Sequence, residues 1–165
     1  MIELDPALAV LDALPRGERL LGFDVGTKTI GLAMSDAERW MATPLETILR
    51  GKFTKDADRI RAHVERYRIG GFVAGLPVNM DGSEGSRAQA TRAFVRNLCR
   101  LVPLPVAFWD ERLSTAAVQR SLIDADASRA KRAEVVDRMA AAYILQGALD
   151  RIRIARQSDT TRDQL

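Results

Sequence analysis

The feature that most constrains this chain is an acidic residue inside an apolar segment. Residues 19–25 (RLLGFDV) have the composition of a buried strand, and Asp24 is the only acid among them. A buried carboxylate costs several kcal/mol unless it is paired, hydrogen-bonded or bound to a metal. A glycine follows at position 26. The segment fits two sites, one in which Asp24 binds a metal and one in which the glycine turn holds a phosphate.

Composition limits the class of protein. The chain has 165 residues, 47% of them apolar and 28% charged, as expected for one soluble globular domain. No apolar run approaches the ~18 residues of a membrane span. The N-terminus lacks the basic region of a secretory signal, and the single cysteine, Cys99, fits a reducing cytoplasm, where we expect the protein.

Charge and cysteine content also bear on ligands. The formal net charge of +3 and the pI of about 9.4 fit a polyanionic partner, and equally fit a solvated arginine-rich surface. The sequence has no Cys/His cluster. Any metal site must therefore use oxygen ligands.

The pattern of apolar residues and turn formers predicts the order of elements. Strands are expected at 19–25, 29–35, 44–49, 72–76 and 105–110, and helices at 5–14, 55–69, 86–101, from about 114, and 132–154. The first three strands form an antiparallel meander, and later strands alternate with helices. The predicted fold class is α/β, a mixed five-stranded sheet (the meander plus two parallel strands) flanked by helices.

The same pattern divides the chain into three parts. Residues 1–18 form an N-terminal helical extension, and residues 19–154 form the domain. Residues 155–165 are a polar tail that we expect to be disordered.

Two further acidic positions interrupt apolar patterns. The first is the pair Asp110–Glu111, which closes the fifth strand. Asp137 lies in the last helix, at the centre of a stripe of small apolar residues. The other members of that stripe are Ala133, Ala140, Ala141, Ile144 and Ala148. A helix face that packs on a sheet does not normally carry an aspartate.

Strand ends and the last helix can bring these acids together. If the strands ending at Asp24 and Glu111 are parallel, their acids emerge at one edge, and the last helix can place Asp137 over both. Crowded carboxylates repel one another, and a divalent cation relieves that repulsion, which indicates Mg²⁺ or Mn²⁺. Taken singly, each acid could instead cap a turn or pair with an arginine. The choice between Asp110 and Glu111 depends on strand register and stays open.

Four collinear segments resemble a known family. They are "LGFDVGTKTIGLAMSD", "GLPVNMDGSEGSRAQATRAF", "DERLSTAAVQRSL" and "VVDRMAAAYILQGALD". Together they are similar to the YqgF/RuvX family of Holliday junction resolvases and pre-16S rRNA nucleases, over about residues 19–150. The resemblance implies an RNase H-like fold and hydrolysis of phosphodiester bonds that leaves a 5′-phosphate and a 3′-hydroxyl. It also implies Mg²⁺ or Mn²⁺, two ions with substrate bound, one activating water and the other stabilising the leaving oxygen.

The resemblance assigns the site residues. The catalytic, metal-binding acids fall on Asp24, on Glu111 rather than its neighbour, and on Asp137. Ala140 and Ala141 occupy the place where many RNase H-like nucleases carry a fourth acid. The implied partner is nucleic acid, either branched DNA or precursor rRNA. Resolving a two-fold symmetric junction would favour a homodimer, whereas trimming rRNA needs only a monomer.

Polar residues around these acids are candidates for nucleic-acid binding. Each of them could instead have a purely structural role, in a solvated turn, an ordinary loop or a helix cap. The candidates are Thr27 and Lys28 in the glycine turn, Asn79 in the 77–85 loop, Arg112 beside Glu111, and Arg129, Lys131 and Arg132 ahead of the last acid.

Two competing functions remain. "FDVGT" also resembles the first phosphate-binding loop of the actin, Hsp70 and sugar-kinase ATPases. Those proteins enclose a nucleotide between two lobes, which 165 residues cannot build. The other alternative is a nucleic-acid-binding module without cleavage activity. Uncompensated acids facing phosphates would hinder such binding, so the retained acids favour a nuclease.

Overall fold

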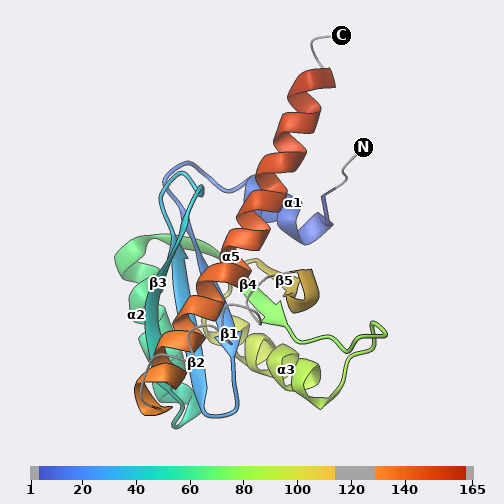
Figure 1. Cartoon of the computed structure of the whole chain (residues 1–165). Coiled ribbons are helices and arrows are strands. Elements are labelled where there is room, and N and C mark those ends of the chain that lie inside the picture. Colours follow the sequence, from blue (N-terminus) through green and yellow to red (C-terminus); the bar gives the residue numbers. More distant parts are fainter. Residues whose placement is uncertain (1–3, 114–128, 163–165) are drawn as a thin grey trace.

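The computed structural model describes residues 4–113 and 129–162 as one five-stranded sheet flanked by helices (Figure 1). The strands are β1 (Arg19–Val25), β2 (Thr29–Ser35), β3 (Ala42–Leu49), β4 (Ile69–Leu76) and β5 (Val106–Asp110). The helices are α1 (Pro6–Asp12), α2 (Phe53–Tyr67), α3 (Ser86–Leu101), the short 3₁₀ helix η1 (Glu111–Leu113) and α5 (Arg129–Arg162). The strand order is β3-β2-β1-β4-β5. β1 is antiparallel to β2 and parallel to β4, which confirms the predicted mixed sheet.

The sheet separates two hydrophobic layers. Alternate residues of β1 point to opposite faces, as the pleat requires. Phe23 packs with α2 and α3 on one face, and its ring meets that of Phe72 edge to face at 5.0 Å. Leu20 packs with α1 and α5 on the other face. α5 runs across this second face of the sheet (Figure 1).

Small residues let α5 lie close to the sheet. A Cβ atom on Gly22 of β1 would lie 2.8 Å from the Cβ of Leu145. Ala140, Ala141, Ile144 and Ala148 are all buried, which confirms the predicted packing stripe. The side chain of Ala133 lies outside the described part of the chain.

The N-terminal extension is part of the core. Leu11 of α1 is fully buried, and its Cδ2 atom lies 2.4 Å from where a Cβ on Gly71 would be. Arg39 holds the segment after α1 by donating to the carbonyl oxygens of Leu14 at 2.9 Å and Glu18 at 2.8 Å. The extension therefore shares the hydrophobic layer that α5 covers.

Two elements extend well beyond their predicted boundaries. β4 begins at Ile69 rather than 72, because Arg68 adopts a left-handed conformation (φ 52°) that ends α2. α5 continues to Arg162, past the predicted end at 154 and through most of the segment expected to be disordered. Its added turns bury Ala155. They also pair Arg156 with Asp12, Nε to Oδ1 at 2.7 Å.

The helix predicted to start near residue 114 lies outside the described residues. No helix within residues 4–113 and 129–162 is both long and apolar enough to cross a membrane.

Candidate active site

Asp24 faces α5 from the end of β1. Its cross-strand partner on β2 is Gly31, and directly opposed residues of an antiparallel pair share a face. Gly22, two residues earlier on β1, touches α5 on that same face. The Asp24 side chain is half-buried at this position. It therefore lies on the α5 side of the sheet, away from the Phe23 layer.

Asp137 lies directly over Gly31. The backbone carbonyl of Asp137 is so close that a Cβ on Gly31 would lie 1.9 Å from its oxygen. Thr29, two residues before Gly31 on β2, donates a hydrogen bond from its hydroxyl to the Asp137 carboxylate oxygen Oδ2. Glycine at 31 thus admits the helix backbone, and Thr29 orients the acid beside the strand that carries Asp24.

Glu111 reaches the same row of residues from the other side. It follows β5 as the first residue of η1, and its Oε1 lies 2.8 Å from the position of a Cβ on Gly75 of β4. Phe23 of β1 pairs with Ala74 of β4, and the two strands are parallel, so the following residues, Asp24 and Gly75, are also neighbours across the strands. The three acids therefore lie on the α5 side of three neighbouring strands, Asp137 over β2, Asp24 on β1 and Glu111 over β4.

The structure distinguishes Asp110 from Glu111. The Arg112 guanidinium donates two hydrogen bonds to Asp110 Oδ2, from Nη2 at 2.7 Å and from Nε at 3.0 Å. Hydrogen bonds from the Arg112 side chain lower the pKa of Asp110 below its ordinary value of 3.8. Trp109, its strand neighbour, packs under α5, so Asp110 points to the opposite face. Glu111, by contrast, lies against Gly75 of β4 on the α5 side.

In this structure the three acids are not grouped as a metal site. Among the His, Cys, Asp and Glu residues that the structure describes, no three are arranged as a group that could hold a metal ion. Asp24, Glu111 and Asp137 come from three different elements. Backbone packing positions those elements, and their side chains supply only oxygen atoms, the donors that Mg²⁺ and Mn²⁺ prefer.

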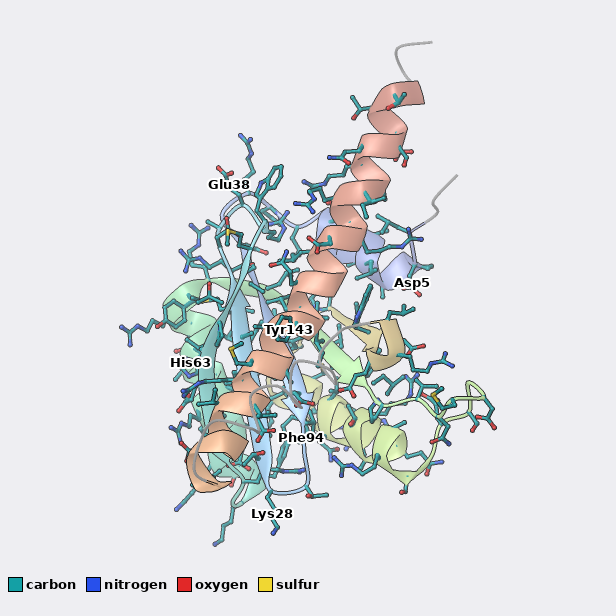
Figure 2. The ribbon with its side chains drawn as sticks, in the orientation of Figure 1. Asp5, Lys28, Glu38, His63, Phe94 and Tyr143 are labelled. Carbon is teal, nitrogen blue, oxygen red and sulfur yellow. The ribbon has the colours of Figure 1, made fainter. Side chains whose placement is uncertain are left out.

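The glycine turn between β1 and β2 presents Thr27 and Lys28 to solvent, and Lys28 extends from its tip (Figure 2). The backbone N–H of Gly26 donates to the Thr29 carbonyl oxygen at 2.8 Å and closes the turn. Thr29 is thereby fixed at both its backbone and its side chain. The turn joins β1, which carries Asp24, to β2, which carries the Thr29 hydroxyl that binds Asp137.

Asn79 and Arg112 hold the 77–85 loop together. The Asn79 side-chain amide donates to Ser83 Oγ at 3.0 Å, and its backbone carbonyl accepts from Gly82 at 2.9 Å. Arg112 Nη1 donates to the carbonyl oxygens of Asn79 at 3.3 Å and Met80 at 3.4 Å. Arg112 therefore ties the loop to the strand end that precedes Glu111.

The remaining basic candidates lie at the start of α5. Arg129, Lys131 and Arg132 belong to its first turns, ahead of Asp137, and their side chains lie outside the described part of the structure.

Comparison with known proteins identifies the family. The model of the family described as "RuvX: Holliday junction resolvase" matches residues 18–151. The chain belongs to this family. The match confirms the resemblance found in the sequence, and it covers every strand of the sheet, α2, α3 and η1, and α5 as far as residue 151.

Relatives of this RuvX-family chain carry names from rRNA processing. A Methylocella silvestris protein named "Putative pre-16S rRNA nuclease" is 68% identical over 136 residues, 82% of this chain and 84% of that protein. A Beijerinckia indica protein with the same name is 62% identical over 152 residues, 92% of this chain and 88% of that protein.

A solved structure supports the fold. RuvC of T. thermophilus, in a complex with a Holliday junction substrate, superposes with a TM-score of 0.52 at 16% sequence identity, covering 86% of this chain and 96% of that chain. The RuvX-family chain shares its fold with this RuvC structure, in agreement with the RNase H-like fold that the resemblance implies.

Thr29 is the site residue that the sequence analysis did not identify. A threonine in a strand is an ordinary β-former, so composition gives no reason to single it out. The period-two pattern of β2 does place it on the same face as Gly31. Only the position of α5 reveals that its hydroxyl meets Asp137.

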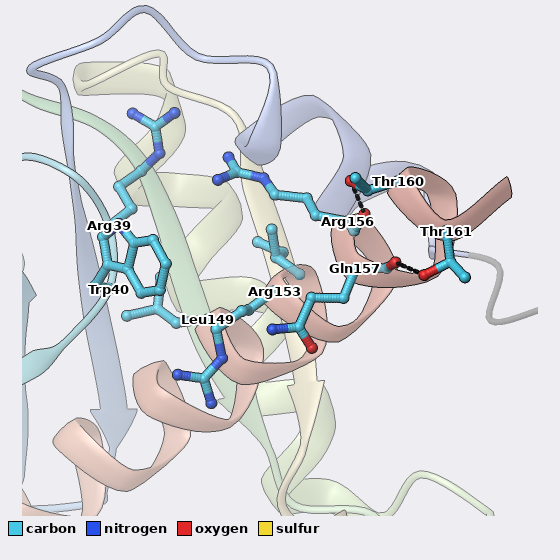
Figure 3. A pocket seen from close by; sticks show the side chains of 9 residues that line it. Arg39, Trp40, Leu149, Arg153, Arg156, Gln157, Thr160 and Thr161 are labelled. Atoms are coloured by element: carbon cyan, nitrogen blue, oxygen red, sulfur yellow. Dashed lines mark hydrogen bonds between the residues drawn. The ribbon is translucent and has the colours of Figure 1, made fainter. Parts of the chain in front are cut away.

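This RuvX-family chain also has a separate hollow of about 370 Å³ at the C-terminal part of α5 (Figure 3). It is lined by Arg39 and Trp40, which belong to the β2–β3 connection, and by residues of α5, among them Arg153 and Thr160. None of the three acids lines it.

Proposed function

We propose that this protein is a divalent-metal-dependent endonuclease that hydrolyses phosphodiester bonds in structured nucleic acid, leaving a 5′-phosphate and a 3′-hydroxyl. The observation that supports the proposal is that Asp24, Glu111 and Asp137 lie on the same side of the sheet, over the neighbouring strands β1, β4 and β2. Membership of the RuvX family supports the same reaction class. A core helix that rests its backbone on a glycine has no structural need for an aspartate there.

The acids have the donor chemistry of a Mg²⁺ or Mn²⁺ site. Their carboxylates are hard oxygen donors, and a cation would offset the repulsion between them. When bound, the metal supplies Lewis-acid stabilisation of the charge that develops in phosphodiester hydrolysis, with two ions in the full site. The chain contributes placement: Thr29 orients Asp137, and the end of β5 directs Glu111 over Gly75.

The surroundings of the acids suit a nucleic-acid backbone. Thr27 and Lys28 present a hydroxyl and an ammonium group in the turn next to Asp24. The 77–85 loop, with Asn79 exposed and Arg112 as its anchor, would flank the substrate. Arg129, Lys131 and Arg132 would add positive charge at the start of α5, within about two turns of Asp137.

The substrate is branched DNA, precursor 16S rRNA or both. The family description concerns Holliday junctions, and the names of the relatives concern pre-16S rRNA. A homodimer would match a two-fold symmetric junction, whereas a monomer would suffice for processing an rRNA end. The oligomeric state under cleavage conditions therefore discriminates between the two substrates.

A cleavage panel tests the proposal. Wild type and Asp24→Asn would be incubated with a four-way DNA junction and with a precursor rRNA fragment, in Mg²⁺, Mn²⁺ or chelator. Asp58→Asn on the exposed side of α2 is the matched control, because it makes the same chemical change away from the acids. We expect cleavage by wild type and Asp58→Asn only with a cation, and none by Asp24→Asn.

Two outcomes would replace the proposal. ATP binding without cleavage of either substrate would favour the ATPase-like interpretation. Tighter nucleic-acid binding by Asp137→Ala, with no cleavage by wild type in Mn²⁺, would favour a binding module.

A further inference from the structure

Two arginine side chains donate hydrogen bonds to the two consecutive backbone carbonyl groups that follow Asp24. Arg87 Nη2 donates to the Val25 carbonyl oxygen at 2.9 Å. Arg50 Nη1 donates to the Gly26 carbonyl oxygen at 2.7 Å. The two side chains come from different elements, since Arg87 lies in the first turn of α3 and Arg50 directly follows β3. Both reach the turn that ends the acid-bearing strand.

The two guanidinium groups are held in place while their side chains remain exposed. Arg50 also lies over the Phe94 ring, 5.3 Å from its centroid, and its backbone N–H donates to the Lys28 carbonyl oxygen at 2.9 Å. Among the ion pairs within residues 4–113 and 129–162, neither Arg50 nor Arg87 has a carboxylate partner. A neutral carbonyl does not cancel their charge.

Lys28 adds a third cation at the tip of the same turn (Figure 2). A guanidinium has five N–H donors, of which a single carbonyl contact uses one. The remaining donors suit two-pronged contacts to phosphate oxygens, a geometry in which arginine exceeds lysine. Because the arginines are already ordered by the carbonyls, less side-chain entropy is lost when a phosphate binds.

We propose that Arg50 and Arg87 bind backbone phosphates of the nucleic acid and, with Lys28, guide the strand across the Gly26–Lys28 turn toward Asp24. The inference rests on the proposed function and names the residues that position its substrate. They act on the phosphates beside the cleaved bond. They contribute to binding and register, whereas the acids carry the chemistry.

Salt-dependent binding tests the inference without cleavage. A fluorescein-labelled four-way DNA junction and an RNA hairpin would be titrated with protein at several NaCl concentrations, in chelator. The variants are Arg50→Gln, Arg87→Gln and both together. Arg96→Gln is the matched control, because Arg96 is an exposed arginine about 13 Å further along α3. Arg50→Lys and Arg87→Lys test whether charge alone restores binding.

We expect each glutamine variant to weaken binding about tenfold, as for the loss of a charge-assisted contact. The slope of log K against log salt should become shallower by about one unit per lost contact. The lysine variants should recover that slope, and Arg96→Gln should resemble wild type. Equal loss on the DNA and RNA probes identifies the phosphate backbone as the ligand, whereas loss on one probe only assigns the contact to that nucleic acid.

Two results would overturn the inference. One is a lower melting temperature in Arg50→Gln or Arg87→Gln with an unchanged salt slope, because a purely structural carbonyl contact affects stability alone. The other is an equal loss of binding in Arg96→Gln, which would indicate non-specific attraction. Cleavage by wild type alongside either result leaves the proposed function standing. A wild type that neither binds nor cleaves either probe overturns both.

Discussion

The backbone carbonyl oxygen of Asp137 lies 1.9 Å from the position that a Cβ atom on Gly31 would take. Any side chain at 31 must therefore push α5 away from β2, because the obstructing atom belongs to a helix backbone and cannot rotate aside. The helix and the acid it carries depend on a residue that has no functional group of its own.

Gly31→Ala should reduce both stability and activity. Forcing a methyl group into a filled space costs about 1–3 kcal/mol, and the short separation from backbone places this site at the upper end. Displacement of α5 would also draw Asp137 away from Asp24. Urea unfolding and the junction cleavage assay would measure the two effects.

Gly51→Ala is the matched control for that change. A Cβ on Gly51 would meet nothing within 4 Å, and alanine retains the N–H that donates to Asp56. We expect a slight stabilisation, because alanine restricts the unfolded chain more than glycine does. Equal effects of the two substitutions would contradict the steric explanation.

Thr29→Val should impair the reaction while preserving the strand. Valine keeps the branched shape of threonine and removes the hydroxyl that orients Asp137. Loss of such a supporting hydrogen bond typically lowers metal affinity or activity roughly 10–100-fold. The measurements are kcat and the Mn²⁺ concentration that gives half-maximal cleavage. Thr29→Ser should retain most activity, and full activity in Thr29→Val with an unchanged Mn²⁺ requirement would exclude the orienting role.

Stability should depend on Asp110 in acid. Because Arg112 lowers the pKa of Asp110 in the folded state below 3.8, the unfolded chain binds more protons in the interval between the two pKa values. The free energy of unfolding therefore rises with pH across that interval. The stabilisation is present above pH 3.8 and is lost as the pH falls through the folded-state pKa.

Asp110→Asn tests this pH dependence. Urea unfolding at a series of pH values should show wild type more stable than Asp110→Asn near neutrality, with the difference shrinking below pH 3.8. A difference that persists in strong acid would mean that the pair acts through packing and not through charge.

Leu11→Ala should destabilise the domain without altering the site. Leu11 is fully buried between α1 and the sheet, and truncating such a leucine costs about 2–5 kcal/mol. Val10 precedes it on α1 with 52% of its surface exposed. Val10→Ala should change stability by less than about 0.5 kcal/mol. Thermal unfolding compares the pair, and cleavage per folded molecule should match wild type in both.

The sequence predicted the sheet because its signals are local. Alternation in β2, the glycine turn after β1 and the apolar run of β4 each depend on neighbouring residues. The alanine stripe likewise located the face of α5 that packs on the sheet. Asp137 stood out because it interrupted that stripe.

Other features depend on contacts between distant segments. The acid at the end of β5 could not be chosen by alternation alone, since Glu111 lies past the strand and Arg112 fixes Asp110 through its side chain. The tail after 154 has a polar composition that suggests disorder. It is helical because Ala155 is buried and Arg156 meets Asp12 of the N-terminal extension, contacts that no local pattern contains.

The long α5 helix, which Arg156 anchors to Asp12 of α1, bears on where a tag can be attached to the protein. α1 and the last turns of α5 lie at the end of the molecule away from the Gly26–Lys28 turn (Figures 1 and 2). A purification tag or a fluorescent protein joined after α5 would therefore project from the end of the molecule away from the Gly26–Lys28 turn. Immobilisation through the C-terminal end would leave that turn accessible, so surface-based binding measurements should attach the protein there.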